Sequence, residues 1–356
     1  MMKNQVIPIM AVIVIVAAAA GGWLLMNDKG SGSGDFTIED MRDRSVSIPN
    51  DLDSVLPMNC CTLEIISYFE SVKKVAAIDK DDIQSDSKIY TKALANLFSS
   101  LETFDRNNTE KIIGLDPSLI ITSTVDVTAL DKLQADTGIP VFAINADLEF
   151  GDDAWFSQIE KLGRIFGEND RAKEIVDGIR SVIKEITDGR TAEDISGYTC
   201  GMMFYGASPL PFLRTSGDWL PFDYAGVTNV MESSIQKQPY NTAIEKVVEK
   251  DIDYIFIDNS NLSATVNELK GYIANSGLSN RAIGNDDIYS VYTYKDWGTQ
   301  FDAVLLNCLY VAKTVNPSGY AWDFDDKADS VLKLLYGDSF GISYVGQAAP
   351  HQIPVE

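Results

Sequence analysis

The chain contains the thirteen-residue stretch Glu110-Lys111-Ile112-Ile113-Gly114-Leu115-Asp116-Pro117-Ser118-Leu119-Ile120-Ile121-Thr122. A matching stretch begins 135 positions later and reads Glu245-Lys246-Val247-Val248-Glu249-Lys250-Asp251-Ile252-Asp253-Tyr254-Ile255-Phe256-Ile257. Each copy predicts the end of a helix, a turn at the aspartate and a short apolar strand. Pro117 fits the first turn because proline cannot continue a helix. A solenoid needs at least three short units, so one repeat at this long period indicates two lobes of similar build.

Apolar segments alternate with helical segments on both sides of these copies. The expected strands cover residues 74–78, 119–122, 141–144, 199–204, 254–258 and 288–292. The expected helices cover residues 62–69, 87–99, 129–137, 242–249, 266–275, 301–314 and 325–336. This alternation predicts an α/β fold with two Rossmann-like lobes, each a parallel sheet with crossover helices.

A long helix is expected between the two copies. Apolar residues recur at spacings of three and four over residues 169–187, and a helix of about 20 residues spans roughly 30 Å. We expect it to join the lobes, although an ordinary surface helix is the alternative. The predicted domains are a first lobe over 35–167, a linking helix over 168–190, a second lobe over 191–336 and a tail over 337–356.

The N-terminus predicts export. Residues 6–26 carry no charge, and as a helix they would be about 31 Å long, close to the thickness of a bilayer core. Lys3 precedes them, so the positive-inside rule leaves the rest of the chain outside the cell. A cleaved signal peptide is the alternative, with small residues at 17–20. Residues 1–34 are therefore expected to be a membrane anchor followed by a flexible Gly/Ser linker.

Composition excludes several classes of function. The net charge of −23 argues against a nucleic-acid partner. His351 is the only histidine, which argues against a protein-bound metal and against haem held by histidine, so no metal or resident cofactor is expected. No nucleotide-binding, metalloprotease or nucleophile-elbow motif is present, which favours a binding protein over an enzyme. Because the chain has 52 acidic residues, an enzyme with a glycosidase-type pair of catalytic carboxylates stays open as an alternative.

Four cysteines occur, at Cys60, Cys61, Cys200 and Cys308, and none has the C-x-x-C spacing of a zinc or redox site. A disulfide between Cys200 and Cys308 and buried free thiols are equally open.

The order of segments resembles the substrate-binding proteins of ABC importers, in the class whose two lobes are joined by one rigid helix. The resemblance rests on the opening hairpin at 36–49, on the first repeat copy with Asn108 before it, on residues 155–172 and on residues 225–230. Asp43 stands where that family usually has glycine in the hairpin turn. The resemblance implies an extracytoplasmic protein, anchored at the cell surface, with an ABC permease and its ATPase subunits as partners.

The resemblance also implies that one glutamate on each lobe docks onto arginines of the permease. The matching positions are Glu110 and Glu245. The alternative is that both are only first-turn glutamates favoured by the helix dipole. The implied ligand is a metal chelate, with a ferric siderophore first and a corrinoid such as cobalamin, or haem, second. A surface-tethered structural or adhesive module is the alternative from another class.

Ligands of parallel sheets sit beyond the carboxyl ends of the strands, so the loops there are the candidates, facing each other across an interlobe cleft. Aromatic side chains supply broad apolar contact and Arg214 suits an anionic chelate oxygen. Cys60 could supply a thiolate to a soft metal, although packing of this segment under a helix capped by Thr62 is the alternative. The candidate ligand-binding residues are Asn59, Cys60, Tyr205, Arg214, Trp219, Tyr294 and Trp297.

Overall fold

A computed structural model describes residues 35–84, 87–190, 194–202, 210–231 and 239–355. The part of the chain from Asp35 to Glu356 forms one compact unit. None of the helices in the described residues is long and apolar enough to cross a membrane. The anchor predicted at residues 6–26 lies outside the described residues.

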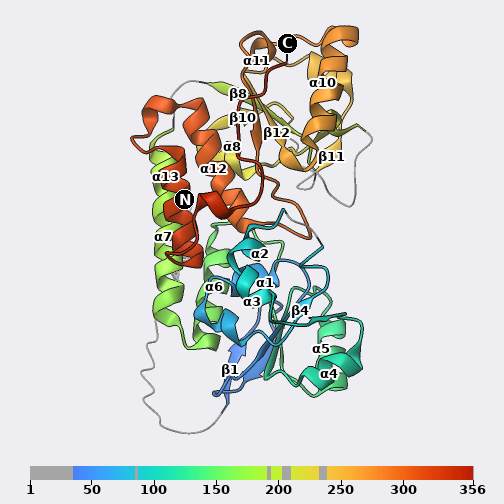
Figure 1. The fold of residues 1–356 in the computed structure, drawn as a ribbon, viewed down its shortest axis with the longest axis vertical. Coiled ribbons are helices and arrows are strands. Elements are labelled where there is room, and N and C mark those ends of the chain that lie inside the picture. Colours follow the sequence, from blue (N-terminus) through green and yellow to red (C-terminus); the bar gives the residue numbers. More distant parts are fainter. Residues whose placement is uncertain (1–34, 85–86, 191–193, 203–209, 232–238, 356) are drawn as a thin grey trace, which may run out of the picture. The chain divides into compact units, whose positions relative to one another are not determined.

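The first lobe is built on a three-stranded parallel sheet in the order β3-β6-β7 (Figure 1). Its strands are β3 (Val55–Met58), β6 (Leu119–Thr122) and β7 (Val141–Ala143), and every residue in them is buried. Two small pairs accompany it: the antiparallel hairpin of β1 (Phe36–Glu39) and β2 (Ser45–Ile48), and the parallel pair of β4 (Ile78–Asp79) and β5 (Thr103–Phe104). Asp43 turns the hairpin at φ 59°, the left-handed region that glycine occupies most easily.

The second lobe is built on a four-stranded parallel sheet in the order β10-β8-β12-β13. Its strands are β8 (Ile195–Cys200), β10 (Val227–Asn229), β12 (Tyr254–Asp258) and β13 (Ile288–Val291). A short antiparallel pair, β9 (Arg214–Thr215) with β11 (Tyr240–Asn241), lies beside it. The α/β fold with parallel sheets is confirmed, whereas the predicted domain boundaries stay predictions.

The two repeat copies fold alike. The first is helix α4 (Thr109–Leu115), a turn and strand β6; the second is α9 (Ile244–Val248), a turn and strand β12. Asp116 ends α4 in the left-handed conformation at φ 47°. Each copy supplies an inner strand, because β6 lies between β3 and β7 while β12 lies between β8 and β13. The helix–turn–strand prediction is therefore confirmed in both copies.

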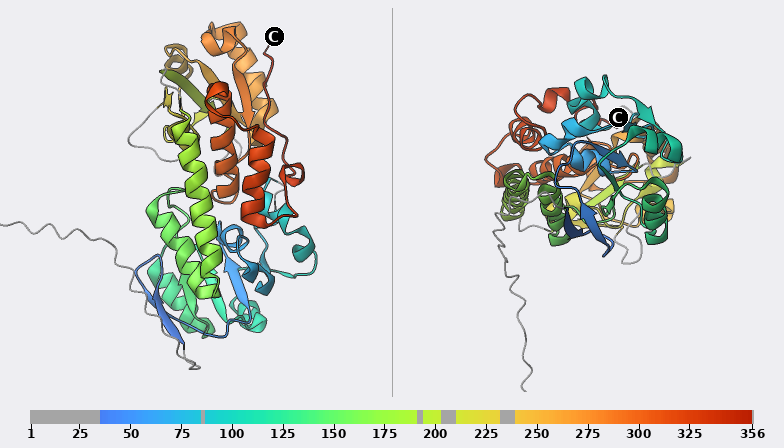
Figure 2. Two further views of the ribbon diagram at one scale, coloured as in Figure 1. Left: turned by 90° about the vertical axis from the view of Figure 1, so that its left-hand side faces the viewer. Right: turned by 90° about the horizontal axis from the view of Figure 1, so that it is seen from below.

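A twenty-residue helix, α7 (Asn169–Asp188), follows α6 (Asp153–Phe166) where the periodicity predicts it. Its apolar stripe of Ile175, Ile179, Val182 and Ile186 is buried. It contacts α6 of the first lobe, and also α8 (Leu220–Ala225), α12 (Phe301–Val315) and α13 (Phe324–Tyr336). Figure 2 shows α7, α12 and α13 running side by side.

The remaining helices are α1 (Thr62–Ile66), α2 (Ile89–Ala93), α3 (Ala95–Phe98), α5 (Val127–Thr137), α10 (Leu262–Ser276) and α11 (Arg281–Gly284). Of these, α5 has 11 residues and α10 has 15, and the others have four or five. Single 3-10 turns occur at Glu70–Lys74, Pro211–Leu213, Asn259–Asn261, Pro317–Gly319 and Ile342–Tyr344.

One apolar core contains side chains of both lobes and of the linking helix. Phe150 and Trp155, which follow the first sheet, pack on Phe301 at the start of α12 with ring centroids 5.9 and 5.6 Å apart. Two smaller clusters cover the outer faces of the two sheets. Because the lobes share apolar packing, they do not behave as separate globules.

Several local predictions differ from the structure. The helix expected over 87–99 is broken at Leu94, whose ψ of 13° leaves the helical region. The strand expected over 74–78 forms only in part: Lys74 ends a 3-10 turn, Val75 makes a single parallel bridge to Val55, and Ile78 begins β4. The strand expected over 199–204 begins four residues earlier, at Ile195 of β8. Strand β3 was not predicted, since Pro57 within it is unfavourable in strands.

Candidate functional site

The first lobe presents a loop at residues 59–61, directly after β3. The Asn59 side-chain amide donates to Thr122 Oγ1 at 3.1 Å and to Thr124 Oγ1 at 2.8 Å. Its backbone N–H donates to Asp79 Oδ2 at 3.2 Å. These bonds tie the carboxyl ends of β3, β4 and β6 together and fix the loop on its sheet.

Two adjacent thiols occupy this loop. Cys60 is partly buried, with its sulfur 3.5 Å from Ser123 Oγ, and Cys61 is buried, with its thiol 3.3 Å from the carbonyl oxygen of Thr299 in the second lobe. The adjacent Cys61 thiol, and then the Ser123 hydroxyl, lower the pKa of Cys60 to about 6 against the opposing effect of burial. The adjacent Cys60, together with burial, raises the pKa of Cys61. Cys60 therefore ionises more readily than Cys61.

The second lobe presents a tight turn at residues 295–299, shortly after β13. The Asp296 N–H donates to the Gly298 carbonyl at 3.1 Å, and Trp297 and Gly298 have φ values of 51° and 95°. A methyl carbon added at Gly298 would lie 2.7 Å from both Cys60 Cβ and Cys61 Sγ. The turn and the cysteine loop thus touch without room for a side chain. We call these two segments, 59–61 and 295–299, the interlobe contact.

Backbone strain gathers at the interlobe contact. Six non-glycine residues of the described chain have positive φ, and three of them, Asn59, Cys61 and Trp297, lie here. Asparagine tolerates this conformation, whereas cysteine and tryptophan adopt it at a cost. Strain of this kind persists only where surrounding structure enforces it, and it clusters at functional sites.

Two cationic side chains flank the contact. Lys295 Nζ donates to Thr299 Oγ1 at 2.7 Å and lies 5.7 Å from the centroid of the Tyr294 ring. Burial lowers the pKa of Lys295, and no carboxylate of the described residues lies within ion-pair distance of it. Arg106 pairs with Asp79 at 3.1 Å and Asp81 at 2.5 Å in the first lobe, and its guanidinium stacks 4.6 Å from the ring centroid of Trp297 in the second.

A family model described as periplasmic binding protein matches residues 68–290, which is more than half of the chain. The chain belongs to the periplasmic binding protein family. The resemblance to the substrate-binding proteins of ABC importers is thereby confirmed. Proteins of this family bind solutes and are not enzymes, in line with the absence of a catalytic motif.

Individual relatives are distant in sequence but alike over nearly their whole length. The molybdate-binding protein MolA of Haemophilus influenzae is 23% identical over 344 residues, covering 89% of this chain and 95% of that protein. The structure of MolA bound to molybdate gives a TM-score of 0.66 at 21% identity, covering 85% of this chain and 98% of that one. An ABC transporter solute-binding protein from Sulfurospirillum deleyianum gives 0.65 at 19% identity, covering 85% and 95%. The periplasmic heme-binding protein HutB of Vibrio cholerae gives 0.58 at 14% identity, covering 74% and 99%.

The residues predicted for the ligand site of this periplasmic binding protein have different surroundings. Asn59 and Cys60 lie in one segment of the interlobe contact and Trp297 in the other. Tyr294 is adjacent but buried, with its hydroxyl 3.3 Å from the sulfur of Met202. Arg214 is half-buried in β9, 3.4 Å from Asn241 Oδ1.

Trp219 and Tyr205 are the other two residues predicted for the ligand site. Trp219 is 2% exposed and packs edge-on against Phe222 with ring centroids 4.6 Å apart, so it lies in the core rather than on an open wall. Its large apolar area is better satisfied by these aromatic neighbours than by solvent. Tyr205 lies outside the described residues. The prediction left out Lys295, Gly298 and Arg106, although Lys295 stands between two residues that it named.

The two predicted docking glutamates lie at corresponding positions. Glu110 is in the first turn of α4 and Glu245 in the first turn of α9. Both are exposed, and neither has an ion-pair partner within the described part of the chain. The neighbouring Lys111 is paired instead with Glu102 at 2.5 Å.

All four cysteines are free, and Cys200 and Cys308 are buried in the second lobe and in α12. The structure therefore favours free thiols over the disulfide that the sequence left open.

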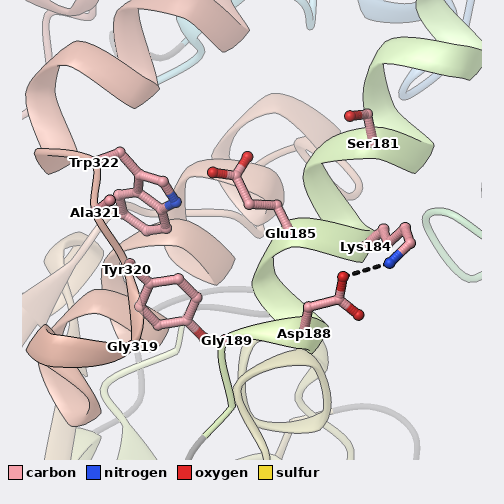
Figure 3. A pocket seen from close by; sticks show the side chains of 9 residues that line it. All are labelled: Ser181, Lys184, Glu185, Asp188, Gly189, Gly319, Tyr320, Ala321 and Trp322. Carbon is pink, nitrogen blue, oxygen red and sulfur yellow. Dashed lines mark hydrogen bonds and ion pairs between the residues drawn. The ribbon is translucent and has the colours of Figure 1, made fainter.

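A pocket of about 450 Å³ lies elsewhere, between the end of α7 and residues 319–322 (Figure 3). Figure 3 shows the rings of Tyr320 and Trp322 facing Glu185 and Asp188. Lys327 neutralises Glu185 and Lys184 neutralises Asp188. This pocket has no charge left for a ligand and does not involve the carboxyl ends of the strands.

Proposed function

We propose that this protein captures an oxygen-rich anionic solute outside the cytoplasm and delivers it to an ABC permease. The first candidate is a compact tetrahedral oxyanion such as molybdate, which the relative MolA is named for binding. The proposal rests on one observation above all: the ammonium of Lys295 lies at the interlobe contact without a carboxylate at ion-pair distance in the described chain.

Burial of an ammonium group is costly unless an opposite charge accompanies it. Burial lowers the pKa of Lys295, which shows that its surroundings disfavour the charged form. Cys60, Asp147 and Asp218 act on Lys295 from beyond ion-pair distance, and a bound anion would supply a partner in direct contact. The indole N–H of Trp297 supports the same reading, because it is buried without an acceptor among the described residues. Both donors would be satisfied by anionic oxygens.

The closeness of the lobes supports a small solute. Gly298 lies against the Cys60–Cys61 pair with no space for a methyl group, and the Cys61 thiol reaches Thr299 directly. A large chelate between these loops would require them to separate. A tetrahedral oxyanion is only a few heavy atoms in size, so less movement would admit it.

A ferric siderophore, the ligand predicted from the sequence, is the second candidate. The aromatic rings of Trp297 and Tyr294 favour it, because they would pack against a bulky chelate. Asp147 and Asp218 also favour it, because their charges act on Lys295 and would weaken the attraction of Lys295 for a free dianion. Corrinoids and haem remain alternatives within this candidate, and HutB is a relative named for heme.

Membrane attachment through residues 6–26 and permease docking through Glu110 and Glu245 complete the proposal. Two exposed carboxylates on equivalent helices of the two lobes would form a bivalent footprint for arginine side chains. A structural or adhesive module would need neither a solute nor these glutamates.

The ligand is tested by calorimetric titration of the full-length protein with molybdate, tungstate, sulfate, ferric hydroxamate and catecholate chelates, cobalamin, cobinamide and haem. We expect saturable binding of molybdate or tungstate and a loss of about tenfold or more in Lys295→Met, because a charge-assisted contact contributes about 1.5–3 kcal/mol. The exposed Lys246→Met is the matched control. Molybdate binding that is equally strong in Lys295→Met, or binding of a ferric chelate alone, would reject the oxyanion candidate.

Docking is tested separately by the double variant Glu110→Arg/Glu245→Arg. We expect uptake through the reconstituted importer to be lost while solute affinity is unchanged. Glu249→Arg, another exposed glutamate beside α9, is the control for added positive charge. Unchanged uptake in the double variant would remove both glutamates from the docking proposal.

A further inference from the structure

Cys60 differs from the other three cysteines in ways that bear on its reactivity. It is the one that is partly exposed, whereas Cys61, Cys200 and Cys308 are buried. Its sulfur lies beside a hydroxyl donor, Ser123 Oγ at 3.5 Å, and beside the Cys61 thiol. Thiolate, not thiol, is the form that attacks a disulfide, and an exposed thiolate with hydrogen-bond donors around it is the reactive kind.

The space around the Cys60 sulfur is too small for an added group unless the neighbouring turn moves. The Gly298 turn of the opposite lobe lies against the pair so closely that a methyl carbon at Gly298 would be 3.3 Å from Cys60 Sγ and 2.7 Å from Cys61 Sγ. The Cys61 thiol holds that turn through the carbonyl oxygen of Thr299. A substituent of several atoms on the Cys60 sulfur competes with the turn for this space.

We propose that Cys60 is a site of reversible S-thiolation by small disulfides, and that the adduct forces the 295–299 turn away from the first lobe. The Cys60 thiolate attacks one sulfur of the disulfide, a new sulfur–sulfur bond forms at Cys60, the original disulfide bond breaks, and the other half leaves as a thiolate that takes a proton from water. The small disulfide is the oxidant, and extracytoplasmic surroundings permit such species. The modification holds whichever solute the protein carries.

Charge selects among small disulfides. Asp147 acts on Cys60, and the whole chain has a net charge of −23. At long range this charge repels a dianion and attracts a dication, whereas Lys295 at the contact acts in the opposite sense at short range, and the long-range preference weakens as salt rises. Cystamine, a cationic disulfide, is therefore the probe of choice, and glutathione disulfide is the anionic comparison.

The full-length protein is incubated with cystamine at pH 6, and peptide mass mapping locates the adducts. We expect one cysteamine per chain, on Cys60, removed by dithiothreitol and absent in Cys60→Ser. Ser123→Ala removes the hydroxyl 3.5 Å from the Cys60 sulfur and leaves the bond from Cys61 to Thr299 in place, and it should slow the reaction at pH 6 several-fold. Reaction at equal rates in wild type and Ser123→Ala, or no reaction at Cys60 while all four cysteines react in urea, would overturn the proposal.

The structural consequence is read by hydrogen exchange over residues 294–300. The amides of Asp296 and Gln300 are hydrogen-bonded within the turn, to Gly298 and Tyr294. We expect the cysteamine adduct to speed their exchange, and Gly298→Ala to do the same without any disulfide. Cys60→Ser incubated with cystamine should exchange these amides at the same rate as Cys60→Ser without cystamine. An adduct that leaves this exchange unchanged would reject the displacement of the turn. Since no solute is present, failure here is distinct from failure of the solute-binding proposal.

Discussion

The two segments that meet at the interlobe contact are held in different ways. The cysteine loop, 59–61, depends on long-range bonds from Asn59 to Asp79, Thr122 and Thr124 on neighbouring strands. The 295–299 turn has bonds within itself, from Lys295 to Thr299 and from Asp296 to Gly298. The first lobe also holds the turn from outside, because Ser87 Oγ donates to Asp296 Oδ2 and the Cys61 thiol donates to the Thr299 carbonyl oxygen. The first segment is therefore a fixed part of its sheet, whereas the second is a small preformed unit that side chains of the first lobe tie in place.

The largest effect is expected at Asp79, which fixes the cysteine loop. Its buried carboxylate accepts from Asn59 N and Arg106 Nη1. Asp79→Ala should lower the free energy of unfolding by about 3 kcal/mol, because it leaves a partly buried arginine and a backbone donor without their partner. Urea denaturation measures the loss. Asp81→Ala, which removes the other carboxylate on Arg106, should cost much less. Equal costs for the two variants would mean that Asp79 does not hold the loop.

The second-largest effect on stability is expected at a buried carboxyl pair, Glu64 and Asp302, which follow the two segments in the chain. Glu64 in α1 accepts from the Asp302 N–H of α12 at 3.0 Å and from the Tyr68 hydroxyl at 2.8 Å. Burial raises the pKa of Asp302 to about 6, and burial followed by the charge of Asp302 raises the pKa of Glu64. Groups with raised pKa values stabilise the fold when protonated, so this stabilisation is complete below about pH 4 and is lost as the pH rises through about 6.

Glu64→Gln tests the pair, because the amide oxygen can keep both hydrogen bonds while the charge is removed. We expect the variant to be more stable than wild type at pH 8, by on the order of 1–3 kcal/mol, and to lose less stability between pH 5 and pH 8. Urea midpoints across this range measure both. A variant whose midpoint follows the wild-type pH profile would show that folding does not raise the pKa of Glu64.

The smallest effect on stability is expected in the 295–299 turn, where the chain offers a matched control. Gly298 and Gly277 both have positive φ, 95° and 64°, but a Cβ at Gly277 meets nothing within 4 Å while one at Gly298 meets the cysteine pair. Gly277→Ala should cost about 1 kcal/mol from backbone strain alone, and Gly298→Ala about 1 kcal/mol more from overlap. Equal costs in urea denaturation would mean that the turn shifts freely away from the first lobe.

The sequence predicted the parts of the fold that local pattern determines. Strands β6 and β12 were placed at their observed bounds because each is an unbroken apolar run after a helix, and α7 follows from its spacing of isoleucines and valines. Strand β3 was not predicted because Pro57 is unfavourable inside a strand, although every residue of β3 is buried in the structure.

The site was predictable only in part. Parallel-sheet geometry directs attention to the loops after strands, which brought Asn59, Cys60 and Trp297 into consideration. The approach of Cys61 to Thr299, residues 238 positions apart, arises from packing that no local pattern encodes. An aromatic residue near such a loop can pack in the core or line a surface, and sequence pattern alone could not show that Trp219 is buried.

The apolar core shared by the two lobes has a consequence for how this protein folds and evolves. Although the chain carries two similar helix–turn–strand units, neither can be separated as an independently stable half, because cutting through α7 would expose the packing of Phe150 and Trp155 on Phe301. Heating should therefore produce one cooperative transition rather than two. The two similar helix–turn–strand units are therefore parts of one folding unit.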